Sequence, residues 1–474
     1  MMLSLFSSGA QGPGRVRRSV ALAGALGSVA AFGTGVASPA SAATTCAIKD
    51  VIGAPAYKDA AGTVDVRLTN GAQRLITRSD LSGAGDSAAG DRFGAAVQAD
   101  CDRVWIGAPG VGGSGAVYVI RFHDGLLRTG VVGKFKLAGA APGDDFGAAI
   151  AVSGSRLWVG APLREVGGST NAGVVVEHAL TSEFPPVAGS TRVVSQGSGA
   201  PGGAEAGDRF GEVLAAAPGG SVVVGTPREN VGDVSDAGMV TVLGRGSGAW
   251  TQNSSGVPGS AEAGDRFGGA VAASGSTMAV GAPGEDSSIA NVGSVQLFNA
   301  KVADGAVTGW SPSYAVSQDT SGVPGVGEAD DGFGSALAFA SQFVGTTCGV
   351  DLAIGASGED VASVADAGSV TIIDAAASSP SRSACPAVGA TQSGALSGRA
   401  QAGDRVGTAI AAQISDPAGP ATALTIGVPG EDVGTATDAG LVHYLKPVPA
   451  GGGSGSTTMT GGAAASARLG SELG

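Results

Sequence analysis

Acidic side chains recur at two places in a repeated pattern of this 474-residue chain, and pairs of them could support chemistry. The aspartates that precede a Phe-Gly pair, or Val-Gly in the last case, are Asp91, Asp145, Asp208, Asp265 and Asp404. The acids that follow a Gly-Ala-Pro-like triplet are Glu285, Asp286, Glu359, Asp360, Glu431 and Asp432. Two such carboxylates brought together could hold a cation or act as acid and base on a glycosidic bond. Aspartate beside glycine also caps tight turns by accepting a backbone N–H, so we expect turn structure and keep a cation or cationic ligand as the alternative.

Other catalytic signatures are missing from the sequence. It contains no G-x-S-x-G nucleophile motif. His123, His178 and His443 stand far apart without a partner at metal-ligand spacing, so we expect them at the surface or at strand ends. The sequence therefore favours a protein that is not an enzyme. The competing hypothesis is a hydrolase or lyase that acts on polysaccharide at the acidic rim.

Composition restricts the fold class. The 84 glycines, 22 prolines and 14% charged residues interrupt helices, but the apolar content is too high for a disordered chain. Short β-branched runs between turn residues predict an all-β fold. The formal net charge of −13 argues against nucleic acid and anionic membranes as partners.

Two linked motifs repeat along the chain. A motif close to G-D-R-F-G occurs around Phe93, Phe146, Phe210, Phe267 and Phe333, with a variant at Val406. The triplets that follow these motifs begin at Gly107, Gly160, Gly225, Gly281, Gly355 and Gly427. A seventh triplet, Gly53-Ala54-Pro55, stands alone. Each unit has room for four short strands, so the sequence predicts seven blades of a β-propeller.

These motifs resemble the FG-GAP repeats of the integrin α-subunit propeller and its bacterial secreted relatives. The resemblance implies a secreted binding or adhesion module with a protein or carbohydrate ligand. It also implies acidic calcium loops between the two motifs. The corresponding segments here, such as Asp100-Cys101-Asp102 and Ser153-Gly154-Ser155, carry too few carboxylates, so we expect no cofactor and no calcium.

The N-terminus has the features of an export signal. Arg15, Arg17 and Arg18 precede an apolar stretch over 19–36, and Ala40-Ser41-Ala42 forms an A-x-A cleavage site. We expect residues 1–42 to be removed after Ala42, by the general or the twin-arginine route, which leaves a secreted, extracellular monomer. A short membrane anchor is the alternative, but glycine and serine dilute the apolar run.

The remaining chain divides into a propeller over 43–449 and a Gly/Ser/Thr-rich segment over 450–474. The first unit lacks its own innermost strand, whereas Arg468-Leu469-Gly470 echoes the start of a unit. We therefore expect the C-terminal residues to complete the first blade, with a disordered tail as the alternative.

Four cysteines in an exported chain predict two disulfides. Cys46, Cys101 and Cys348 each lie shortly before a triplet, and Cys385 follows a third strand. Their places on one rim predict the pairs Cys46-Cys101 and Cys348-Cys385, with free buried thiols as the alternative.

Overall fold

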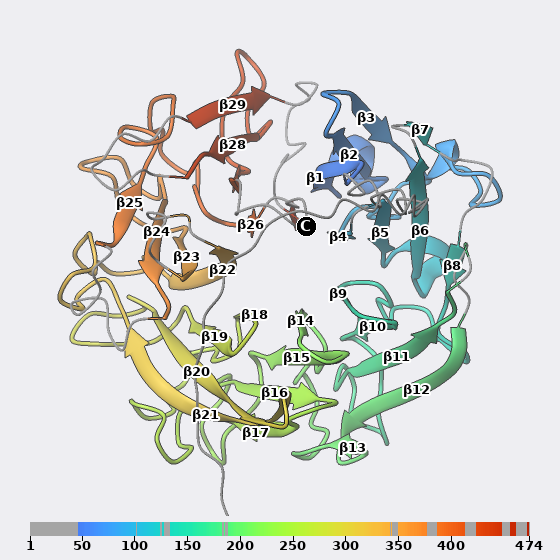
Figure 1. The fold of residues 1–474 in the computed structure, drawn as a ribbon, viewed down its shortest axis with the longest axis horizontal. Coiled ribbons are helices and arrows are strands. Elements are labelled where there is room, and N and C mark those ends of the chain that lie inside the picture. The colour runs from blue at the N-terminus through green and yellow to red at the C-terminus, as the bar shows by residue number, and fades with distance from the viewer. Residues whose placement is uncertain are drawn as a thin grey trace, which may run out of the picture. The chain divides into compact units, whose positions relative to one another are not determined.

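Seven sheets, antiparallel except for the short β12–β13 pair, stand around a central axis in the computed structural model, so the predicted seven-bladed β-propeller is confirmed (Figure 1). The structure describes residues 46–473 except 101, 124–125, 128–132, 183, 185–187, 342, 344–348, 377–385, 413–422, 448–455 and 461–471. The predicted export signal lies outside these residues. Among those described, no helix has the length and apolar composition needed to span a bilayer.

The first three blades follow the chain from the N-terminal side. Blade 1 contains β1 (Ile48–Ala54), β2 (Thr63–Leu68), β3 (Gln73–Ile76) and β30 (Glu472–Leu473). Blade 2 contains β4 (Ala96–Ala99), β5 (Arg103–Ala108), β6 (Ala116–His123), β7 (Leu126–Leu127) and β8 (Gly133–Phe135). Blade 3 contains β9 (Ile150–Ser153), β10 (Arg156–Ala161), β11 (Val174–Leu180), β12 (Ala188–Gln196) and β13 (Gly199–Ala200). The short helical turns are α1 (Tyr57–Ala60), η1 (Arg78–Asp80) and η2 (Val111–Gly113).

The other four blades repeat the same order. Blade 4 contains β14 (Val213–Ala217), β15 (Ser221–Thr226), β16 (Met239–Leu243) and β17 (Gly248–Trp250). Blade 5 contains β18 (Ala270–Ser274), β19 (Thr277–Ala282), β20 (Ser294–Ala303) and β21 (Ala306–Val316). Blade 6 contains β22 (Phe333–Ser341), β23 (Val350–Ala356), β24 (Ser369–Asp374) and β25 (Val388–Ala390). Blade 7 contains β26 (Ile410–Ala412), β27 (Leu424–Val428), β28 (Leu441–Leu445) and β29 (Ser456–Thr460).

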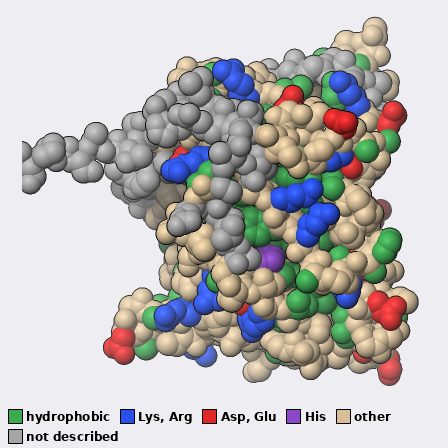
Figure 2. Space-filling view, turned by 90° about the vertical axis from the view of Figure 1, so that its right-hand side faces the viewer, with side chains coloured by type: hydrophobic (Ala, Val, Ile, Leu, Met, Phe, Trp, Pro, Cys, Tyr) green, Lys and Arg blue, Asp and Glu red, His purple; other side chains and the backbone are tan. Residues whose placement is uncertain are grey.

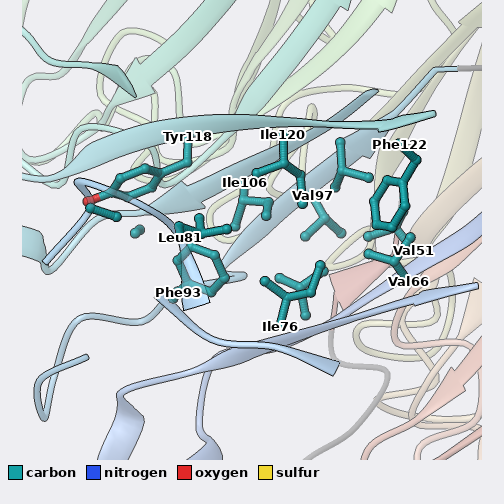
Figure 3. Close-up of a cluster of buried hydrophobic side chains, with 14 of the residues drawn as sticks. Val51, Val66, Ile76, Leu81, Phe93, Val97, Ile106, Tyr118, Ile120 and Phe122 are labelled. Atoms are coloured by element: carbon teal, nitrogen blue, oxygen red, sulfur yellow. The ribbon is translucent and has the colours of Figure 1, made fainter. Parts of the chain in front are cut away.

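Apolar side chains fill the spaces between successive blades. The cluster between blades 1 and 2 includes Val51 and Val66 from one sheet and Ile106 and Ile120 from the other (Figure 3). The motif residue Phe93 lies in this cluster and is fully buried. Each such side chain contributes about 1.5–3 kcal/mol on burial, so the core holds the blades together as well as stabilising each sheet.

The motif phenylalanine also joins two blades through its backbone. Phe267, which precedes blade 5, donates its N–H to Ala237 O at the start of the third strand of blade 4. Gly238 lies directly beneath it with φ +88°, and a Cβ there would approach Phe267 O to 2.3 Å. The glycine that closes the polar loop is therefore required by this close approach.

The ring closes between the two ends of the described chain. β30 pairs with β1 through Ile52–Leu473 and Gly53–Glu472, which supplies the strand that the first unit lacks. The closing residues are thus Glu472–Leu473, whereas Arg468–Gly470 lies outside the described residues. Tyr444 of blade 7 donates a hydrogen bond of 3.1 Å to Asp50 of β1 and so joins the same two blades.

One part of the C-terminal segment differs from our expectation. Residues Ser456–Thr460, expected within a flexible connection, form β29 and pair with β28. Three threonines in this short run favour an extended backbone despite the neighbouring glycines. The last blade therefore takes its outermost strand from the Gly/Ser/Thr-rich segment.

The outer side of blades 2 and 3 carries charges of both signs. Figure 2 shows basic and acidic side chains interspersed with hydrophobic ones on this side. A mixed surface of this kind favours solubility rather than the binding of one highly charged partner.

Candidate functional site at the blade junctions

The repeated aspartates cap turns immediately before the innermost strands. In each case one carboxylate oxygen accepts the backbone N–H of the residue three positions earlier, at 2.6 or 2.7 Å. The six capping aspartates are Asp91, Asp144, Asp208, Asp265, Asp331 and Asp404, and all are buried. Turn capping is therefore confirmed for Asp91, Asp208, Asp265 and Asp404.

Two positions differ from the sequence interpretation. Asp144, not Asp145, is the capping residue of the second motif, because the capping position lies two residues before the phenylalanine. Asp145 occupies the next position, has φ +59° and pairs with Arg92. Asp331 was missed, although it stands in the same register before Phe333.

A glutamate from the loop after the second strand completes four of the junctions. These loop glutamates, four residues after the first glycine of each triplet, are Glu229, Glu285, Glu359 and Glu431. The sequence analysis included three of them and missed Glu229, whose triplet reads Gly-Thr-Pro. Each interacts electrostatically with the capping aspartate of the same blade.

A glutamine from the preceding blade binds each loop glutamate. Gln196 ends β12, whereas Gln252, Gln318 and Gln392 follow the fourth strands of blades 4 to 6. Each donates its Nε2 to the glutamate of the next blade. For Gln392 and Glu431 the distance is 2.7 Å. The sequence analysis missed all four glutamines. Their signal was a position at the end of each fourth strand, a similar distance before the next capping aspartate.

Burial disfavours the charged form of these acids. It is the main cause that raises the pKa of four capping aspartates, to about 6 for Asp208, Asp265 and Asp331 and to about 7 for Asp404. The same cause raises the pKa of Glu229, Glu285 and Glu359 to about 7, and neighbouring acids raise it further. The pKa of Glu431 is also raised by burial. These acids therefore keep a proton to a higher pH than exposed carboxyl groups do.

The unsatisfied oxygens agree with a retained proton. In the described part of the chain, the second carboxylate oxygen of the capping aspartate accepts no hydrogen bond at any of the four junctions. A protonated partner carboxyl could donate to it, which would remove the cost of a buried oxygen without a donor.

The two other described junctions use arginine instead. Arg78 Nε donates to Asp91 over 2.8 Å, and Arg164 Nη1 donates to Asp144 over 2.6 Å. Arg78 follows β3, where the other blades place glutamine, and Arg164 stands where they place glutamate. Each capping aspartate thus meets either an arginine or a Glu-Gln pair.

The remaining predicted acids also belong to turns. Asp286, Asp360 and Asp432 are exposed, and each accepts a backbone N–H from its own loop, from Asn291, Asp366 and Asp438. Their capping role is confirmed, and it fixes the loop that carries the neighbouring glutamate.

Comparison with known families agrees with this repeat. The family model for the FG-GAP repeat matches residues 250–298, which run from the end of blade 4 through the first two strands of blade 5 into the third. The chain therefore contains an FG-GAP repeat at these residues. The described residues form seven blades, which agrees with the resemblance to the integrin α-subunit propeller.

Comparisons with individual proteins are less informative. Comparison with curated proteins gives no match. Among solved structures, a candidate 6-phosphogluconolactonase from Bacteroides uniformis is 10% identical, with a TM-score of 0.47 and coverage of 87% of this chain and 96% of that one. Another from Bacteroides fragilis is 11% identical, with a TM-score of 0.48 and coverage of 91% and 98%. AofleA from Arthrobotrys oligospora is 9% identical, with a TM-score of 0.37 and coverage of 78% and 89%. At these identities and TM-scores the likenesses carry no information about activity.

Two histidines lie in the core, so the expectation that they are at the surface or at strand ends was wrong. His178 and His443 are buried in third strands, and burial lowers the pKa of each to about 4. His178 contacts the ring of Phe135 and shares a 3.0 Å hydrogen bond with Thr191. Third strands are packed on both faces, which is why these rings are not at the surface. The side chain of His123 lies outside the described residues.

The segments that carry calcium in FG-GAP relatives are occupied by ion pairs or short turns here. Asp100 pairs with Arg103 and Asp102 pairs with Arg121, both at 2.6 Å. Within the described residues, no group of three or more His, Cys, Asp or Glu side chains could hold a metal ion. These residues therefore do not fit the family's calcium site.

The disulfides are described only in part. Cys46 is buried and disulfide-bonded. Cys101, Cys348 and Cys385 lie outside the described residues. The pairs Cys46-Cys101 and Cys348-Cys385 stay predictions.

Proposed function

We propose that the protein is a non-enzymatic binding module that acts outside the cell and presents one face of the propeller to a protein or carbohydrate ligand. The observation that carries this proposal is the repetition of the acidic site. The same Asp, Glu and Gln interactions recur at four successive junctions. A catalytic centre needs one such constellation, whereas a repeated contact between blades requires one at every junction.

The compartment follows from separate features. The basic and apolar residues before Ala42 support export, and a disulfide at Cys46 supports an oxidising environment. The loops on the rim of a propeller are free to vary between blades, so this rim is suited to recognition.

A hydrolase or lyase that acts on polysaccharide is the second candidate, because one junction borders a pocket. Glu285 lines a pocket of about 180 Å³ together with Asp286, Ser317 and Thr320. Burial raises the pKa of Glu285 to about 7, and a carboxyl group with a raised pKa is the kind of general acid that glycosidases use beside a second carboxylate.

A combined binding and turnover experiment separates the two candidates. The full-length secreted protein is applied to glycan and protein arrays, and the same preparation is assayed against a panel of polysaccharides. We expect stable binding to a defined ligand without release of sugar. Turnover that is lost in Glu285→Gln but kept in the matched variant Glu431→Gln would establish the enzyme instead.

A further inference from the structure

Arginines recur at the position directly after the capping aspartate. All six residues there have φ between 52° and 61°, in the left-handed region: Arg92, Asp145, Arg209, Arg266, Gly332 and Arg405. Gly332 adopts this conformation without strain, whereas a residue with a Cβ atom loses about 1–2 kcal/mol of conformational free energy there. The backbone therefore gives no reason for arginine at this position.

Side chains at successive positions of this set can reach one another. Arg92 Nη2 lies 2.7 Å from Asp145 Oδ1, although the two residues belong to adjacent repeats. The equivalent positions before blades 4 and 5 are occupied by Arg209 and Arg266. Two positive charges therefore stand where the earlier repeats have the Arg92–Asp145 ion pair. Among the described residues, Arg266 forms no ion pair and its side chain is exposed.

A third arginine adds to this positive charge. Glu212 lies between Arg209 and Arg228, with its two oxygens 3.5 and 3.4 Å from Arg209 Nη1 and Arg228 Nε. Two guanidinium groups thus contact one carboxylate, and Arg266 lines the same pocket without an ion pair among the described residues, so positive charge is in excess here. The preceding acids, Asp208 and Asp265, are buried and accept backbone N–H groups.

Arg228 and Arg266 line a pocket that we call the Arg228–Arg266 pocket. Its volume is about 220 Å³, and its other lining residues are Glu212, Val213, Pro227, Gly269 and Pro283. Two arginines therefore meet beside a small apolar wall formed by valine and proline.

We propose that the Arg228–Arg266 pocket binds an oxyanion group, a carboxylate, sulfate or phosphate, carried by a sugar of an otherwise neutral molecule. This inference rests on the proposed binding function and names its ligand class. A guanidinium group presents paired N–H donors that match two oxygens of such a group. The valine and proline side chains provide apolar contact for the C–H face of the sugar.

Size and charge both limit the ligand. The pocket is smaller than the roughly 300–1,000 Å³ that encloses a whole small molecule, so it accepts one substituent or one sugar ring. The protein's net charge of −13 repels a polyanion at long range. The attraction of the pocket acts only within a Debye length of about 8–10 Å, so a ligand with few charges is favoured.

The test compares acidic and neutral sugars on the full-length protein by titration calorimetry. The probes are methyl glucuronide, galactose 6-sulfate and glucose 6-phosphate, with methyl glucoside as the neutral probe. The variants are Arg266→Gly, which copies Gly332, and Arg228→Gln. The matched control is Arg92→Gly, because Arg92 occupies the equivalent position but is paired with Asp145.

We expect at least one acidic probe to bind and the neutral probe not to bind. Arg266→Gly and Arg228→Gln should each weaken that binding about tenfold or more, because each removes a charge-assisted hydrogen bond, and Arg92→Gly should leave it unchanged. The probe that binds identifies the oxyanion. Absence of binding by all three probes, or equal binding by wild type and Arg266→Gly, overturns the proposal.

The arrays distinguish this failure from failure of the binding function. If Arg266→Gly keeps every array ligand of the wild type, the protein is a binding module whose ligand lies elsewhere. If the wild type binds nothing on the arrays and releases sugar from polysaccharide, the binding function itself is wrong.

Discussion

A buried aspartate needs a cation or a proton nearby, and the capping aspartates meet this need in two ways. Arg78 and Arg164 provide a cation at the first two described junctions. A glutamate and a glutamine surround the aspartate at the next four. Since both solutions keep the same turn, the aspartate is the constant part of the repeat and its partners are exchangeable.

Loss of the Arg78 partner should destabilise the protein strongly. Arg78 and Asp91 are both buried, and Arg78→Met would leave an unpaired carboxylate inside. We expect a loss of about 3–5 kcal/mol in the free energy of unfolding, measured by urea denaturation. The control Arg92→Met breaks a more exposed pair and should cost about 0–1 kcal/mol. Similar costs for both variants would contradict this role of Arg78.

The Glu-Gln junctions should make stability depend on pH. The folded-state pKa values of Asp265 and Glu285, about 6 and 7, lie above the ordinary values of 3.8 and 4.5. The folded protein therefore binds more protons than the unfolded chain between about pH 4 and 7, and stability falls as the pH rises through this window. Glu285→Gln keeps the shape and removes one charge. Relative to the wild type, the substitution should increase the free energy of unfolding at pH 8 by on the order of 1 kcal/mol more than it does at pH 5. An equal effect at both pH values would show that Glu285 is not protonated in the fold.

Part of this site could be predicted from the sequence. The aspartates were recognisable because they precede a phenylalanine at constant spacing, and Asp145 was chosen because two adjacent aspartates share that place. Gln196 and its equivalents stand at a similar distance before the next capping aspartate, but the glutamate that each one binds belongs to the next blade, at separations from 33 to 41 residues. Contacts across a junction have no fixed spacing in sequence.

At the scale of elements, the polar loop before each third strand is fixed to the next blade by a glycine. Gly238→Ala would place a Cβ 2.3 Å from Phe267 O, so blades 4 and 5 must separate. Gly232→Ala is the matched control, since Gly232 also has positive φ but faces open space. The control should cost about 1–2 kcal/mol for backbone strain alone, and Gly238→Ala should cost clearly more in urea denaturation. Equal costs would mean that the close approach does not hold the blades together.

Strands with strong β-branched patterns were predictable and weaker ones were not. The second strands end in the triplet and are buried on both faces, so their sequence is almost entirely apolar, as in β19. β29 has threonine and serine in a glycine-rich context and gives no such signal. It becomes a strand because β28 offers a free edge, which is a tertiary cause.

At the scale of the whole molecule, the two ends of the ring meet in blade 1. Removal of residues 467–474 deletes β30 and leaves the backbone of Ile52 and Gly53 without its partner. We expect a lower melting temperature and association of the truncated protein through the open edge, measured by thermal unfolding and sedimentation. A truncated protein that keeps the melting temperature and the monomeric state of the full chain would show that closure does not need this strand.

The central claim is that the repeated acids form structural contacts between blades and perform no chemistry. The direct test replaces all four loop glutamates, as Glu229→Gln, Glu285→Gln, Glu359→Gln and Glu431→Gln in one protein, and measures thermal unfolding at pH 5 and pH 8 beside ligand binding on the arrays. The account predicts that the four substitutions raise the melting temperature, relative to the wild type, more at pH 8 than at pH 5. It also predicts that the variant binds the same array ligands as the wild type. A folded variant that loses an activity or a ligand of the wild type would contradict it.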